Sequence, residues 1–150
     1  MTQQHDEFKN FSFFVLPNNI TGSVAIPITL SPTPTPLASL TLRSDCNCNC
    51  AVLLNATVGW LAVANGTGLD RVDVLFKIWR GLPLSNLVFS ADDSAEAAFD
   101  SRKVTSFSHV DTNFGSLRLY TYYLTAELPD AGSAATVIGP ITFTATEIED

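Results

Sequence analysis

The chain has few charged residues. Only 15% of its 150 residues are Asp, Glu, Lys or Arg, whereas an average globular protein has about 25%. Hydrophobic residues make up 46%, and intrinsically disordered chains instead combine low hydrophobicity with high charge. The sequence therefore predicts a folded chain with extensive burial, or one that buries surface by self-association.

Basic residues are especially scarce. Eight Lys and Arg stand against 15 Asp and Glu, which gives a formal net charge of -7. They are scattered from Lys9 to Arg118, with only Arg102 and Lys103 adjacent, and form no stripe. Because neutralising phosphates requires clustered Lys and Arg, we expect no nucleic-acid partner.

Long apolar runs are absent as well. No stretch reaches 18 apolar residues, since polar residues interrupt even residues 51–64, so we expect no membrane span. The first ten residues, MTQQHDEFKN, are polar, and the apolar run at residues 11–16 is shorter than the core of a secretory signal. If the protein ends up outside a cell, we expect another route, such as lysis of the cell that made it.

The sequence also lacks the common catalytic motifs. It contains no Walker loop, no G-x-S-x-G elbow, no H-E-x-x-H and no dinucleotide fingerprint. Ser108, His109 and Asp111 lie within four residues, but on a strand Ser108 points to the opposite face from the other two, so they cannot form a triad. We therefore expect these three residues to lie at a solvated strand end, and we expect no enzyme and no cofactor.

Acidic residues gather in two places. The segment Asp92, Asp93, Glu96 and Asp100 lacks the glycine and terminal glutamate of an EF-hand loop. We therefore expect no metal there but a solvated acidic loop, with a helical turn as the less favoured alternative. A charged terminus is expected at Glu147, Glu149 and Asp150.

What the sequence does contain is the pattern of strands and turns. Eight Gly and eight Pro separate short runs rich in Val, Ile, Thr, Phe and Tyr. Two runs place apolar residues at every second position: Val52, Leu54, Ala56, Val58 and Trp60, and then Val72, Val74, Phe76 and Ile78. We predict an all-β fold, an antiparallel β-sandwich or jelly roll of about eight or nine strands with an N-terminal extended arm.

Prolines divide the chain into two parts. Residues 31–36, SPTPTP, favour a stiff extended connector. We therefore assign residues 1–36 to an N-terminal arm with its Pro-rich connector and residues 37–150 to the β-sandwich domain. Within the arm, residues 24–30 alternate like a strand, and Pro27 predicts an edge strand or a bulge because proline cannot donate to a ladder.

Three cysteines alternate with asparagines at Cys46, Cys48 and Cys50. On an extended strand, neighbours in this cluster lie about 6.6 Å apart with parallel side chains, which suits a disulfide poorly. Three is also an odd number, so one thiol is left over if two pair. Intermolecular crosslinking is favoured, with inert thiols in a loop or a metal site completed by other ligands as alternatives.

Six strand-like segments follow one another in a fixed order: ASLTL at residues 38–42, VLLNATVGW at 52–60, VLFKIWR at 74–80, VTSFSHVD at 104–111, LYTYYLTAE at 119–127 and VIGPITF at 137–143. In this order they resemble the exosporium protein C family of spore-surface proteins from spore-forming Firmicutes. The resemblance covers residues 37–146 and implies a spore surface or exosporium location, extracellular after mother-cell lysis. The cysteine cluster and the Phe-rich arm are departures from the family pattern.

The leading hypothesis is a structural subunit that assembles with other copies of itself, with other spore-surface proteins as further candidate partners. Residues 8–30 would add a strand to a neighbouring copy, joined by intermolecular disulfides. The docking candidates are Phe11, Phe13, Val15, Val24, Ile26 and Ile28. The alternative is a trimeric jelly-roll binding module that recognises a carbohydrate or a host surface. Core or interface packing is the favoured use of Trp60, Trp79, Tyr120, Tyr122 and Tyr123, ahead of a sugar-stacking platform.

Overall fold

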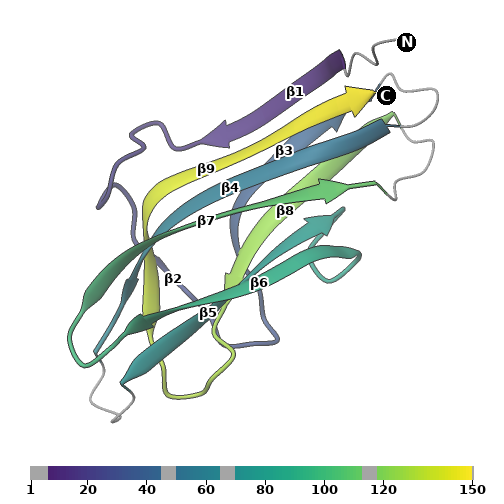
Figure 1. Cartoon of the computed structure of the whole chain (residues 1–150). Helices are drawn as coiled ribbons and strands as arrows, with labels where there is room; N and C mark the ends of the chain where they lie inside the picture. The colour runs from purple at the N-terminus through teal and green to yellow at the C-terminus, as the bar shows by residue number, and fades with distance from the viewer. Residues whose placement is uncertain (1–6, 45–49, 65–69, 113–117, 150) are drawn as a thin grey trace, which may run out of the picture.

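A computed structural model describes residues 7–44, 50–64, 70–112 and 118–149. Over these ranges the chain forms nine β-strands and no helix, so it contains no helix long and apolar enough to cross a membrane. The strands form two antiparallel sheets packed face to face (Figure 1). The predicted all-β sandwich is confirmed. The strands are β1 (Glu7–Val15), β2 (Ile26–Pro27), β3 (Thr35–Arg43), β4 (Cys50–Ala62), β5 (Arg71–Arg80), β6 (Leu87–Glu96), β7 (Ser101–Asp111), β8 (Leu119–Glu127) and β9 (Ala135–Glu149).

Apart from the two-residue β2, which pairs with β9 on the side opposite β4, each sheet has two edge strands. The first sheet has the order β1-β9-β4-β7, with β2 also paired to β9, and the second has the order β3-β8-β5-β6. Edges β1 and β3 lie beside each other on one side of the sandwich, and β6 and β7 lie beside each other on the other side. The sandwich therefore has two sides, each formed by one edge from each sheet.

The core lies between the sheets and follows the alternation in the sequence. The predicted apolar faces of β4 and β5 are buried, because Val52, Leu54, Ala56, Val58 and Trp60 and then Val72, Val74, Phe76 and Ile78 are at most 3% exposed. Tyr120 and Tyr122 are buried too. Packing, rather than a sugar platform, is the use that the structure gives to both tryptophans and to these two tyrosines.

The outer surface of the second sheet is covered by its own side chains. Trp79 Nε1 donates a hydrogen bond to Thr125 Oγ1 over 2.9 Å. Lys77 Nζ lies 5.6 Å from the centre of the Trp79 ring and 2.8 Å from Glu127 Oε1. Thr125 and Glu127 are fully buried although they lie on the outer surface of the sheet. Trp79 and Lys77 therefore cover polar groups of β8 there.

The N-terminal segment belongs to the first sheet. β1 pairs with β9 from Phe8↔Ile148 to Val15↔Thr142, and β2 pairs with β9 through Ile26↔Val137 and Pro27↔Thr136. Without them the backbone groups of β9 on that side would lack ladder partners. Residues 7–36 therefore supply β1, β2 and the first two residues of β3 to the sandwich. Of residues 24–30, only Ile26 and Pro27 form a strand, β2. Because β2 pairs with β9 alone, the edge position predicted for Pro27 is confirmed.

The acidic segment is a strand rather than a loop. β6 runs to Glu96 and pairs with β5 through Leu75↔Asp92, Val74↔Asp93 and Arg71↔Glu96. The expectation of a solvated loop or helical turn at residues 92–100 is wrong for its first half. Its sequence, DDSAE, shows no apolar alternation, so backbone pairing with β5 fixes its conformation.

Candidate functional site

Three apolar side chains of β1 point to solvent. Phe11 is 61% exposed, Phe13 59% and Val15 43%. The two rings are stacked with centroids 5.8 Å apart and an angle of 29° between their planes. We call Phe11, Phe13 and Val15 the β1 face. Because β1 is an edge strand, this face lies beside backbone groups that have no ladder partner within the sheet.

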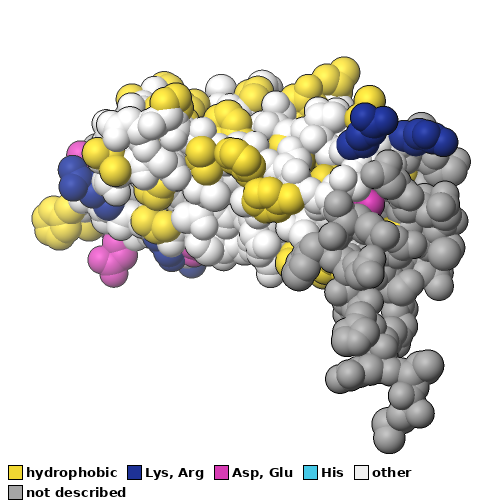
Figure 2. Space-filling view, turned by 90° about the horizontal axis from the view of Figure 1, so that it is seen from above, with side chains coloured by type: hydrophobic (Ala, Val, Ile, Leu, Met, Phe, Trp, Pro, Cys, Tyr) yellow, Lys and Arg dark blue, Asp and Glu magenta, His cyan; other side chains and the backbone are white. Residues whose placement is uncertain are grey.

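The surroundings of the β1 face carry little charge. Figure 2 shows the side of the molecule along which β1 runs, seen from above. Hydrophobic and uncharged polar side chains cover most of its described part, and Lys, Arg, Asp and Glu lie toward its two ends. The middle of this side is therefore suited to contact with an uncharged surface.

Rows of side chains continue from the β1 face across the outer surface of the first sheet. Read from β1 through β9 and β4 to β7, the rows are Phe11, Thr146, Leu53 and Val110; Phe13, Thr144, Asn55 and Ser108; and Val15, Thr142, Thr57 and Ser106. None of these twelve residues is charged. We call them the outer rows.

The other three docking candidates pack inside their own subunit. Ile28 is 6% exposed and belongs to the core, and Val24 and Ile26 are partly buried against it. The subunit's own core therefore covers Ile28 and part of Val24 and Ile26. Phe11, Phe13 and Val15 are the docking candidates whose side chains are exposed.

The opposite side of β1 faces the core. Phe14 packs against the core cluster, and Asn10 Nδ2 donates a hydrogen bond to Glu147 Oε1 over 3.3 Å. Glu147 is fully buried, so the expectation of a solvated charged terminus is wrong at this residue. These contacts fix which face of β1 is turned outward.

The cysteine cluster lies mostly outside the described residues. Cys46 and Cys48 belong to that part, whereas Cys50, the first residue of β4, is bonded in a disulfide. The chain has three cysteines, so a disulfide within it leaves one thiol over. Among the described residues, no group of three or more His, Cys, Asp and Glu is placed to hold a metal ion.

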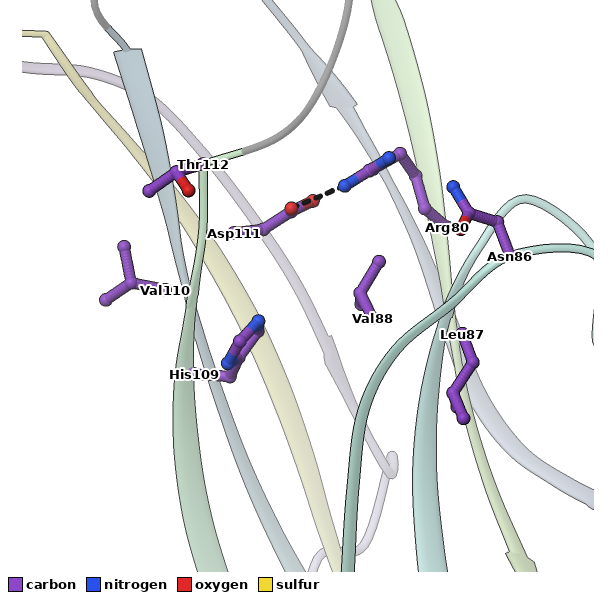
Figure 3. A pocket seen from close by; sticks show the side chains of 8 residues that line it. All are labelled: Arg80, Asn86, Leu87, Val88, His109, Val110, Asp111 and Thr112. Atoms are coloured by element: carbon purple, nitrogen blue, oxygen red, sulfur yellow. Dashed lines mark hydrogen bonds and ion pairs between the residues drawn. The ribbon is translucent and has the colours of Figure 1, made fainter.

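A cavity of about 290 Å³ opens between the beginning of β6 and the end of β7 (Figure 3). Its lining includes Leu87, Val88 and His109, with Arg80 and Asp111 turned toward each other. Arg80 Nε donates to Asp111 Oδ2 over 2.9 Å and Arg80 Nη2 donates to Oδ1 over 2.5 Å. The two charges therefore neutralise each other within the cavity wall.

Tyr122 completes this cluster from the core. Its hydroxyl donates to Asp111 Oδ2 over 2.8 Å. The hydrogen bonds to Asp111 raise the pKa of the Arg80 guanidinium against the opposing effect of burial. Burial first, and then the hydrogen bond to Asp111, raise the pKa of the Tyr122 phenol above its usual range. Arg80 therefore stays charged and Tyr122 stays protonated at neutral pH. Because Arg80 lies on β5, Tyr122 on β8 and Asp111 on β7, their contacts join the two sheets, and we call such a polar cluster between the sheets a clamp.

This clamp was missed from the sequence, where Asp111 was expected at a solvated strand end. Asp111 is 3% exposed. The alternation rule did place His109 and Asp111 on one face and Ser108 on the other, and the structure has Ser108 exposed and Asp111 buried. The ring of His109 lies 5.3 Å from that of Phe89. No triad geometry links Ser108 to His109.

A second clamp joins β6 to β7 farther along. Lys103 Nζ donates to Asp93 Oδ1 over 2.6 Å and to the Ser94 carbonyl over 2.7 Å. Thr105 Oγ1 donates to Asp93 Oδ2 over 2.7 Å and accepts from Trp60 Nε1 over 2.8 Å. Partial burial raises the pKa of Asp93, but the hydrogen bonds from Lys103, Thr105 and the Ser94 N–H together outweigh it and lower that pKa.

No family model and no curated protein matches the chain. Among solved structures, the chain is similar to part of dimeric latent PorU from Porphyromonas gingivalis, with 11% identity and a TM-score of 0.47. The match covers 97% of this chain and 13% of the PorU chain. The chain thus spans about an eighth of the length of that protein.

Proposed function

We propose that the chain is a structural, non-catalytic subunit that assembles with further copies of itself through β1. The observation that carries the proposal is the exposure of Phe11, Phe13 and Val15 at 61%, 59% and 43% on an edge strand. Burying a Phe or Val side chain contributes about 1.5–3 kcal/mol. A strand edge beside such a face also offers unpaired backbone groups to a second chain.

The spore surface is the proposed place of the assembly. Its support is the resemblance of residues 37–146 to the exosporium protein C family, which implies release by mother-cell lysis. The small fraction of charged residues, 15%, also favours this role, because few charges lose their contact with water where copies meet. Other spore-surface proteins remain candidate partners.

Intermolecular disulfides are part of the same proposal. Cys50 is in a disulfide and the chain has three cysteines, so one thiol is left for a bond between copies. Denaturing gels of the assembled protein should show ladders without reductant and a single band with it. A single band in both lanes would eliminate the crosslink.

The test of β1 is a double substitution, Phe11→Ser with Phe13→Ser. Both side chains are exposed, so we expect the fold to persist while association weakens at least about tenfold, which corresponds to about 1.4 kcal/mol. The matched control is Phe99→Ser, because Phe99 is 80% exposed but lies outside β1. Sedimentation velocity over a concentration series measures the association.

Three outcomes are decisive. Concentration-dependent assembly that the double variant loses and Phe99→Ser keeps supports the proposal. A wild-type protein that stays monomeric at every concentration contradicts it. Discrete trimers that are indifferent to both the double substitution and reductant would favour the binding module instead.

A further inference from the structure

We propose that the partner of β1 is the second half of β7 in the next copy, so that subunits join head to tail into an open array. The inference rests on the proposed self-assembly and names the surface that receives β1. β1 and β7 are the two edges of the same sheet. A contact between two different edges leaves one β1 and one β7 free at the ends of every assembly.

Strand direction permits this contact. β1 is antiparallel to β9, β9 to β4, and β4 to β7. The three reversals make β1 and β7 run in opposite directions within one subunit. When a second copy is placed beside the first in the same orientation, its β1 is therefore antiparallel to β7, and the ladder continues without a change of pattern.

Prolines and charges protect parts of three edges. β3 carries Pro36 near its start, and proline cannot donate to a ladder. The second half of β6 presents the exposed acids Asp92 and Glu96, and β7 carries Arg102 and the inward-facing Lys103 after its first residue. Prolines and charges of this kind oppose edge pairing in natural sheets.

Both edges of the first sheet contain a stretch without such protection. Residues 10–15 of β1 and residues 106–110 of β7 contain no Lys, Arg, Asp, Glu or Pro, and the second sheet has comparable stretches at residues 37–42 of β3 and 87–91 of β6. Of these stretches, only the one in β7 can receive β1 as a continuation of the ladder of the first sheet. Val110 is 48% exposed, and Ser106 and Ser108 are exposed as well. Uncharged edges matter here because every copy has a formal net charge of -7, and like charges on facing edges would oppose the contact.

The unprotected stretches of β1 and β7 also stand at the same level of the sheet. The outer rows connect Phe11 to Val110, Phe13 to Ser108 and Val15 to Ser106. If the rows continue into the next subunit, Phe11 lies beside Val110, and the charged start of β7 lies beyond Val15. The β1 face then contacts uncharged side chains along its length.

The shape of the array follows from the sheet. Because neighbouring strands are rotated by about -20 to -25°, successive subunits are related by a rotation as well as a translation. A head-to-tail contact that does not close gives a helical filament. A symmetric contact of β1 with β1 would instead stop at a dimer.

The experiment uses one variant for each edge. Phe13→Lys places a charge on the β1 face, and Ser108→Lys places one opposite it on β7; both sites are exposed. Each variant alone should associate at least about tenfold more weakly than wild type, because the new charge is buried without a partner. Ala131→Lys, at an exposed site in the turn between β8 and β9 and outside every edge strand, is the control and should assemble like wild type.

Mixing the two variants identifies the contact. Phe13→Lys retains a normal β7 and Ser108→Lys retains a normal β1, so an equimolar mixture should form dimers that grow no further, as measured by sedimentation velocity. Circular dichroism of each variant checks that the fold persists. Normal assembly of Ser108→Lys alone, or a mixture that stays monomeric, would overturn the contact with β7 while leaving assembly through β1 intact. A monomeric wild type would instead remove the proposed function itself.

Discussion

At the scale of single residues, two polar clamps hold the β6 and β7 side of the sandwich together. Arg80, Asp111 and Tyr122 join β5 and β8 to β7, and Asp93 with Lys103 joins β6 to β7. Both clamps link one sheet to the other. They fix the position of β7, the strand that we propose as the acceptor of β1.

Removing one partner of the buried ion pair should destabilise the fold strongly. Asp111→Ala leaves the Arg80 guanidinium largely buried without a counterion, and breaking a buried pair in this way costs about 3–5 kcal/mol. The control is Asp73→Ala, since Asp73 pairs with the exposed Arg71 and exposed pairs contribute about 0–1 kcal/mol. Urea denaturation measures both. Equal losses of unfolding free energy in the two variants would show that Asp111 contributes no more to stability than a partner of an exposed ion pair.

The lowered pKa of Asp93 predicts a pH-dependent contribution to stability. Because the folded pKa lies below that of the unfolded chain, about 3.9, the ionised form stabilises the fold above that value. This stabilisation is lost as the pH falls through the folded pKa. Asp93→Asn should therefore be less stable than wild type at pH 7, and the difference should shrink below pH ~4. A difference that stays constant in urea denaturation from pH 7 to pH 3 would contradict it.

The clamps were the part of the molecule least accessible to sequence reasoning. Alternation places His109 and Asp111 on one face of a strand. It does not show that Arg80, which is 31 residues away, points toward Asp111 from the opposite sheet. Burial of a charged side chain can be predicted only when its ion-pair partner is known. Sequence reasoning therefore assigned both Asp93 and Asp111 to solvent.

At the scale of elements, the strands with strict alternation were predicted best. β4 and β5 repeat large apolar side chains at every second position, and burial of that face determines their conformation. β6 has no such repeat over DDSAE and is held by its ladder to β5. Local pattern therefore predicts strands that bury a face and misses those fixed by a neighbour.

The N-terminal segment shows the same limit. Phe11 and Phe13 alternate as Ile26 and Ile28 do, yet the first pair points to solvent and the second packs into or against the core. Alternation indicates that a face is apolar, but not what covers it. The outward direction of the β1 face follows from the contacts of Asn10 and Phe14 on its other side.

The division of roles within this segment is testable by truncation. Ile28→Ala should cost about 2–5 kcal/mol of stability, as expected for a buried Ile. Phe11→Ala should change stability by less than about 0.5 kcal/mol, because its side chain is exposed. Urea denaturation at a concentration where the protein is monomeric measures both. An Ile28→Ala variant as stable as wild type would return Ile28 to the docking candidates.

At the scale of the whole molecule, the net charge opposes association, whereas the uncharged sheet edges favour it. Each copy has a formal net charge of -7, so copies repel at long range, while the outer rows provide an uncharged contact. Salt screens the repulsion over about 10 Å at 0.1 M. Association should therefore strengthen from 20 mM to 300 mM salt in light scattering. Weaker association at higher salt would mean that ion pairs, rather than the β1 face, hold the copies together.

The most direct measurement is hydrogen exchange of backbone amides in dilute and in concentrated protein. If β1 joins β7 of the next copy, amides within residues 10–15 and 106–110 that lack a partner in the monomer become hydrogen-bonded and exchange more slowly on assembly. The amides of β4, which already has a ladder partner on each side, should not change. New protection at residues 10–15 and 106–110 is the predicted result, and unchanged exchange of β1 in assembled protein would contradict its role as the assembly strand.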